Sequence, residues 1–191
     1  MKFLQGVIYI KNLNNTKKIT IISIAMAINI VGGFIALGLR LPLYLDGLGT
    51  VLIGFVLGPK YGALAGLLSA TINGMSFDIY SFYFSPAQIL LGYFSGIIPK
   101  LKTGTLKEKI LLNFIVAIPI CLVSSFISAK LFGTVTSSGS SYFVQILRAI
   151  GVNDIMSVFL IQFITDYFDK LFAILIVSKI VNSRGFKEIY S

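Results

Sequence analysis

The carboxyl and amide side chains of the last apolar segment have the clearest capacity for chemistry. Asp166 and Asp169 lie three residues apart on the helix face that also carries Gln162, and Lys170 follows directly. Two such carboxylates can act as an acid/base pair, contact a ligand, or form a salt bridge with Lys170 or Lys130. Ionisable groups inside an apolar segment need partners or water, so several of these residues are expected to face inward. We interpret Lys170 as structural.

A second group of polar and aromatic side chains lies where apolar segments meet their loops. Three loops carry them, and they could line one closed, outward-facing pocket, although for any single tyrosine an interfacial belt is the alternative. Alanine at Arg148 or Asp46 is therefore expected to weaken ligand binding without preventing membrane insertion. The candidate substrate-binding residues are Arg40, Tyr44, Asp46, Asn73, Asp78, Tyr80, Tyr83, Gln88, Tyr142, Arg148, Asn153, Asp154, Gln162 and Asp166.

Composition removes several classes of function. The sequence has no histidine and one cysteine, Cys121, in an apolar run, so we expect no metal site, no cofactor and no disulfide framework. Binding and transport are favoured over catalysis, and no catalytic residue is predicted. The net charge of +9 comes from lysines beside hydrophobic runs rather than on a basic face, so nucleic acid is not an expected partner.

The elements that must position these residues are apolar helices. The chain is 56% hydrophobic and 12% charged, which indicates a lipid bilayer as its solvent. We expect an all-α integral membrane fold, with six spans in one domain covering residues 1–191. After a cytoplasmic lead-in over 1–18, the spans are expected at 19–39, 43–58, 61–77, 82–99, 110–132 and 152–181. Residues 133–151 are expected to form a long loop with an amphipathic piece at 142–150.

The basic residues predict the orientation. In a six-span arrangement, all but Arg40 and Arg148 among the lysines and arginines of the connecting segments fall on one side, which is the cytoplasm. Both termini are therefore expected inside the cell.

Small residues recur at four-residue spacing along two of these segments. Such spacing lets helix backbones approach closely in lipid, either inside one molecule or against a partner. The pattern consists of Ser23 and Ala27, Gly32 and Ala36, and Gly62, Gly66 and Ala70.

Two stretches resemble a known family. Residues 41–74 contain Asp46, Gly49 and Thr50 as Asp-x-x-Gly-Thr and Gly58, Pro59 and Gly62 as Gly-Pro-x-x-Gly, and residues 169–181 begin with Asp-Lys. These motifs, with the size and the six-span plan, resemble the S components of energy-coupling factor (ECF) transporters, multi-pass proteins of the bacterial cytoplasmic membrane.

The resemblance implies a binding subunit that hydrolyses nothing. Such a subunit captures a vitamin or related micronutrient from outside and docks on a membrane T component driven by two ATPases. Its pocket lies beneath the outer loops, and small residues of span one face the T component, so the docking candidates are Ser23, Ala27, Gly32 and Ala36.

The ligand is left open by the sequence. Tyrosines could stack on a flat heterocycle, Arg40 or Arg148 could hold a carboxylate or phosphate, and aspartates could accept from ring or amine donors, which favours a heterocyclic cofactor precursor. Two other classes stay open: a homo-oligomeric membrane scaffold or channel, and an intramembrane enzyme using Asp166 and Asp169.

Overall fold

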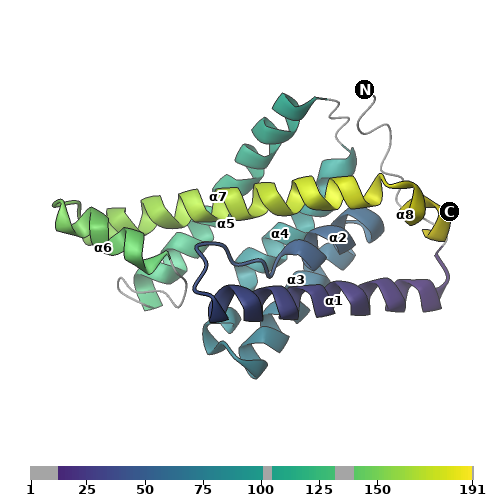
Figure 1. The fold of residues 1–191 in the computed structure, drawn as a ribbon, viewed down its shortest axis with the longest axis horizontal. Coiled ribbons are helices and arrows are strands. Elements are labelled where there is room, and N and C mark those ends of the chain that lie inside the picture. The colour runs from purple at the N-terminus through teal and green to yellow at the C-terminus, as the bar shows by residue number, and fades with distance from the viewer. Residues whose placement is uncertain (1–12, 101–104, 132–139, 191) are drawn as a thin grey trace.

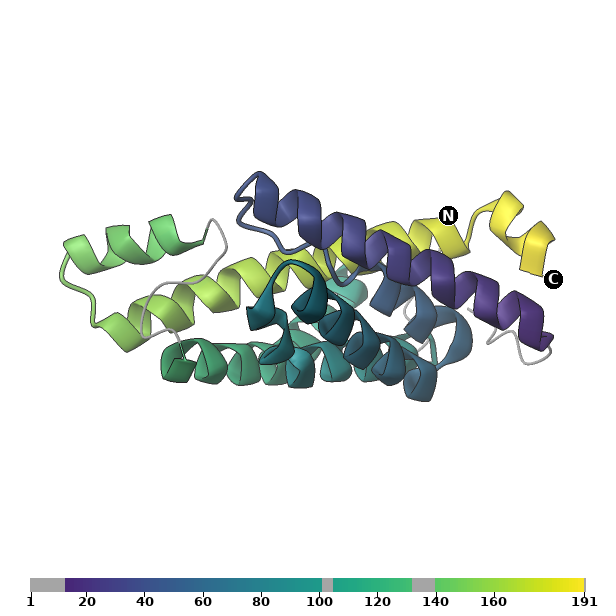
Figure 2. The same cartoon turned by 90° about the horizontal axis from the view of Figure 1, so that it is seen from below.

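All regular structure in the described part of the chain is helical. The computed structural model describes residues 13–100, 105–131 and 140–190, so residues 1–12 of the expected lead-in lie outside it. In Figure 1 the long helices Asn15–Gly38 and Asp154–Val181 run in roughly the same direction, and the third long helix, Leu106–Leu131, crosses the second of them obliquely; Figure 2 shows shorter helices between them. The helices are α1 (Asn15–Gly38), α2 (Leu48–Leu57), α3 (Pro59–Ser76), α4 (Ser85–Ile97), α5 (Leu106–Leu131), α6 (Ser141–Ala149), α7 (Asp154–Val181) and α8 (Arg184–Tyr190), with short 3-10 turns η1 (Ile79–Phe82) and η2 (Ile98–Lys100).

Local chemistry explains where several helices begin. Asn14 caps α1 by accepting from the N–H of Lys17 over 3.0 Å, and Asn153 caps α7 by accepting from the N–H of Ile155 over 3.0 Å. Gly58 has φ 92°, a conformation that suits glycine, and Pro59 then opens α3, where its missing N–H costs nothing. The chain therefore reverses tightly between α2 and α3.

Helix α2 forms the centre of the molecule. Residues 49–56 are all buried, and α2 packs against α1, α3, α4 and α7. A helix that is apolar all round fits such a position. Helices α3 and α4 cross closely at their glycines. A Cβ at Gly62 would overlap the carbonyl oxygen of Gly92, and a Cβ at Gly66 would overlap the carbonyl oxygen of Gln88. The small residues of α3 therefore serve internal packing.

Each of the six expected segments contains a helix, but their bounds differ. The expected span at 43–58 is wrong at its start, since 41–47 is an irregular loop and α2 begins at Leu48. Its 10 residues cover about 15 Å, half of a hydrocarbon core of about 30 Å. The segment 82–99 is divided between the end of η1, α4 and η2, while 142–150 corresponds closely to α6.

Two helical stretches are long and apolar enough to cross a membrane. They are Asn15–Gly38 and Ile110–Ser128, with mean hydropathies of 2.2 and 2.5. Helix α7 is longer, with 28 residues, but carries Asp166, Asp169 and Lys170 near its middle. By length and composition, the fold therefore has at least two helices suited to lipid.

Apolar side chains cover much of the outer surface, whereas polar ones are buried. Val31 and Phe34 on α1, Leu111 and Phe126 on α5, and Phe168 on α7 are all largely exposed. Monomers that live in water rarely expose apolar surface so extensively.

Candidate functional site

A cavity lies among α1, α3, α4, α5, α7 and the loop 41–47. Its volume is about 80 Å³ when measured as the space open to the centres of water molecules. Since about 10–15 Å³ of such space holds one water, the cavity suits a compact small molecule. It is lined by Gly33, Ala36, Leu37, Leu41, Leu43, Tyr44, Asp46, Asn73, Phe77, Asp78, Tyr80, Ser81, Phe84, Ala87, Gln88, Ile120, Ser124, Gln162, Asp166 and Lys170.

The loop between α1 and α2 brings two functional side chains to the cavity. Arg40 and Leu45 have positive φ angles of 49° and 54°, which turn the chain back inward after α1. The N–H groups of Tyr44 and Leu45 both donate to Oδ1 of Asp169, each over 3.1 Å. Asp169 on α7 thus fixes the loop from which Tyr44 and Asp46 reach the cavity.

A buried charge cluster forms the wall on α7. Nζ of Lys170 lies 3.2 Å from Oδ1 of Asp166 and 3.3 Å from Oδ2 of Asp169, and all three side chains are nearly inaccessible. Nζ also lies 5.6 Å from the centre of the Tyr44 ring. Lys170 is thus the partner of both aspartates, while Lys130 is exposed and lies over Phe126.

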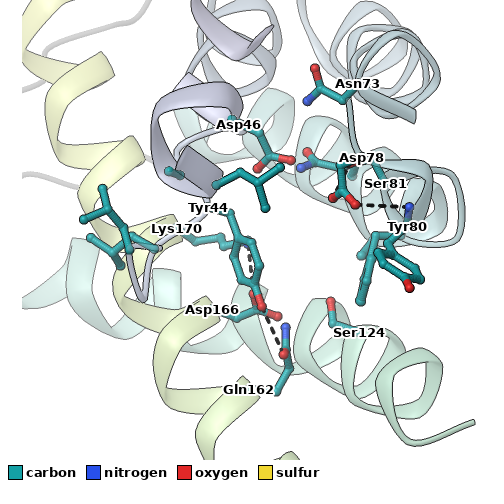
Figure 3. A pocket seen from close by; sticks show the side chains of 18 of the residues that line it. Tyr44, Asp46, Asn73, Asp78, Tyr80, Ser81, Ser124, Gln162, Asp166 and Lys170 are labelled. Carbon is teal, nitrogen blue, oxygen red and sulfur yellow. Dashed lines mark hydrogen bonds and ion pairs between the residues drawn. The ribbon is translucent and has the colours of Figure 1, made fainter. Parts of the chain in front are cut away.

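The Tyr44 side chain crosses the cavity toward α7. Its hydroxyl donates to Oε1 of Gln162 over 3.1 Å, and Figure 3 shows this bond below the tyrosine ring, beside Asp166. Loop and helix are therefore joined by side-chain as well as main-chain hydrogen bonds.

The opposite wall comes from the end of α3 and from η1. Asp78 caps η1, since Oδ1 accepts from the N–H of Tyr80 over 3.3 Å and Oδ2 accepts from the hydroxyl of Ser81 over 3.2 Å. Asn73, one turn earlier on α3, is 1% exposed. In Figure 3 these residues face Asp46 and Tyr44 across a shared space.

Four buried oxygen atoms at this cavity receive no hydrogen bond from any described residue. They are Oδ1 of Asp46, Oδ1 of Asn73, Oε1 of Gln88 and Oδ2 of Asp166. The Gln88 side chain is itself a hydrogen-bonding neighbour of Asp46. Buried oxygens without a donor are costly, so this cavity is prepared to accept hydrogen bonds from water or a ligand.

Eight of the fourteen predicted substrate-binding residues line the cavity. The structure brings together Tyr44, Asp46, Asn73, Asp78, Tyr80, Gln88, Gln162 and Asp166.

The six other predicted residues lie away from it. Arg148 forms a 2.9 Å ion pair with Asp154, Asn153 caps α7, Tyr83 is exposed, and Arg40 donates to the Tyr142 hydroxyl over 3.2 Å. The structure therefore does not bring Arg148 and Asn153 to the cavity that Asp46 lines. The physical reason is that Arg148 on α6 pairs with Asp154 at the start of α7, while Asn153 caps α7.

Sequence reasoning missed the remaining lining residues. Lys170 was interpreted as structural, which its ion pairs support, yet it also borders the cavity. Ser81 was detectable from its place beside Asp78, and Ser124 from its place in an apolar helix. Apolar residues such as Phe77 and Phe84 carry no signal that separates a pocket wall from core.

The four predicted docking residues do not share one surface. Ser23 and Ala27 are exposed, whereas Ala36 is buried against the cavity and Gly32 packs on the main chain of Leu45. Of the four, only Ser23 and Ala27 are therefore exposed on the outer surface of α1.

The chain has no match among family models, curated proteins or solved structures. Among the described residues, no group of three or more His, Cys, Asp or Glu side chains is placed to hold a metal ion.

Proposed function

We propose that this chain is the substrate-binding subunit of an ECF-type importer in a bacterial cytoplasmic membrane. It captures a vitamin or heterocyclic cofactor precursor at an outward-facing pocket and then docks on a T component with two ATPases. In this proposal it spans the membrane six times, with both termini in the cytoplasm, and catalyses no reaction.

The observation that carries the proposal is the cavity itself. Side chains from residues 33 to 170 meet around one small space, and several of its buried polar atoms have no partner among the described residues. A scaffold or simple channel needs no such site, whereas a binding subunit does. The motifs at Asp46 and at Asp169–Lys170 fall beside this cavity and in the charge cluster that holds its loop.

The distribution of surface and charge supports the membrane arrangement. The large exposed side chains of α1, α3, α5 and α7 are mostly apolar, as lipid contact requires. Figures 1 and 2 place the start of α1, the end of α7 and α8 at one end of the molecule, and Lys17, Lys18, Lys179 and Arg184 are there. Positive residues gathered at one end favour a cytoplasmic location for that end.

A ligand screen tests the binding function. The detergent-purified chain is heated with vitamins, nucleobases and their precursors, because a ligand that binds only the folded state raises the unfolding temperature. Gln162→Ala removes the partner of Tyr44 at the cavity and is expected to reduce the shift, while Arg148→Ala serves as the matched control outside the cavity. Uptake by vesicles containing the chain, a T component and the ATPases then tests transport.

Other outcomes select the alternatives. Stable homo-oligomers without any ligand-dependent shift would favour a scaffold or channel. An intramembrane enzyme using Asp166 and Asp169 is disfavoured by geometry, since Asp169 binds two N–H groups through one oxygen and Lys170 through the other.

A further inference from the structure

We infer that the cavity selects a positively charged small molecule, one that carries a protonated amine or an amidinium-like group beside a flat ring. The inference deepens the proposed function and rests on it in one respect, that this cavity is the ligand site. Asp46 and the free oxygen of Asp166 are the groups that would hold the positive charge.

The charge balance of the buried groups carries the first step. Asp46, Asp166 and Asp169 are three carboxylates, and Lys170 is the one cation whose side chain is buried among them in the described structure. Lys170 bonds to Asp166 and Asp169, and no described basic residue pairs with Asp46. A further positive charge would therefore be stabilised in this space, whereas a further negative charge would be repelled.

The hydrogen-bonding atoms carry the second step. Oδ1 of Asp46 and Oδ2 of Asp166 are buried and receive no bond from the described residues. Ionised carboxylates can only accept, so the matching ligand group must donate. Asn73 and Gln88 present oxygens as well, but their amides can turn to present NH₂ groups. The two carboxylates therefore determine which ligand charge the cavity prefers.

The surrounding side chains carry the third step. Phe77, Phe84 and Tyr80 line the same cavity, and aromatic faces attract both flat rings and cations. The arginines predicted to hold a carboxylate or phosphate, Arg40 and Arg148, do not line it. Among the described lining residues, Lys170 alone carries a positive charge, and its Nζ is already shared by two aspartates.

Three compounds of nearly equal shape test the sign of the preferred charge. Benzamidine is a cation, benzamide is neutral and benzoate is an anion, and each has a size that suits the cavity. Their affinities for the purified full chain are measured by thermal shift and calorimetry at concentrations up to about 10 mM, since fragments of this size bind weakly. Benzamidine is expected to bind at least tenfold more tightly than benzamide, and benzoate is expected to give no shift.

Variants then identify the groups that recognise the charge. Asp46→Asn is expected to lower benzamidine affinity about tenfold and to lower benzamide affinity much less, because the shape is kept and one charge is removed. Asp154→Asn is the matched control, since Asp154 is exposed and pairs with Arg148 outside the cavity. The order of affinities of the three compounds is measured on the unsubstituted chain. It therefore tests the inference even if Asp46→Asn does not fold.

Each other result has a defined meaning. Equal or tighter binding of benzamide or benzoate overturns the inference while the cavity remains a ligand site. If none of the three binds but a vitamin of the earlier screen does, the inference on charge fails and the proposed function stands. If nothing binds in either screen, both fail.

Discussion

Replacing Asp169 by alanine is the most informative single perturbation of this fold. Its carboxylate accepts from the N–H groups of Tyr44 and Leu45, each over 3.1 Å, and lies 3.3 Å from Nζ of Lys170. Asp169→Ala removes all three interactions, including the carboxylate that accepts from two part-buried N–H groups. Breaking a buried ion pair costs about 3–5 kcal/mol, and we expect a loss of this size in the free energy of unfolding.

Asparagine at position 169 separates the contribution of the hydrogen-bond acceptor from that of the negative charge. The side-chain oxygen of Asp169→Asn can still accept from both N–H groups, whereas the ion pair with Lys170 is lost and Lys170 keeps only Asp166 as its partner. Each of the two N–H bonds weakens by about 1 kcal/mol when its acceptor becomes neutral, so these bonds together lose about 2 kcal/mol, and the total loss is expected to stay below that of Asp169→Ala, which has no acceptor at all. The assay is denaturant unfolding of the detergent-purified variants, followed by circular dichroism. A loss below about 0.5 kcal/mol for Asp169→Ala would refute the role of Asp169 in holding the loop.

Two further predictions follow from contacts elsewhere in the structure. Asn29→Ala removes a buried amide that bonds Thr50, Ser69 and the N–H of Gly49, so we expect a loss of about 1–3 kcal/mol in the same unfolding assay, with exposed Asn15→Ala near zero as the control. Arg148→Ala breaks a partly exposed ion pair, so we expect the free energy of unfolding to change by less than about 1 kcal/mol and the ligand affinity to stay unchanged. A large drop in ligand affinity would instead show that Arg148 takes part in binding.

Hydropathy predicted the helices well but not their depth in the structure. The long apolar runs correspond to α1, α5 and α7, and the amphipathic stretch near residue 142 corresponds to α6. The segment expected to span the membrane at 43–58 contains α2, whose residues 49–56 are enclosed by protein. An apolar side chain has the same signal in lipid as in a core, so sequence alone cannot separate the two environments.

The site was predictable where a polar or charged side chain, costly to bury in an apolar environment, had only one environment that could satisfy it. Asp166 and Gln162 lie on a face of a long apolar helix, so burial in a polar cavity was the physically favoured arrangement, and both line it. Arg148 had another solution, because Asp154 lies close enough to neutralise it at the surface. Polar residues in loops have many possible partners at the surface, and the sequence does not show which of them is used.

Leu45 of the connecting loop contacts both α1 and α7 beside the cavity. The N–H of Leu45 donates to Asp169 on α7. The carbonyl oxygen of Leu45 lies so close to Gly32 on α1 that a Cβ there would overlap it. Leu45 also has φ 54°, so its backbone has little freedom to relax toward either helix. Because Tyr44 and Asp46 flank this residue, a small displacement of α1 against α7 must move both cavity side chains together. In the proposed function, the exposed docking candidates Ser23 and Ala27 belong to the same helix, so docking on a partner would act on the cavity through α1.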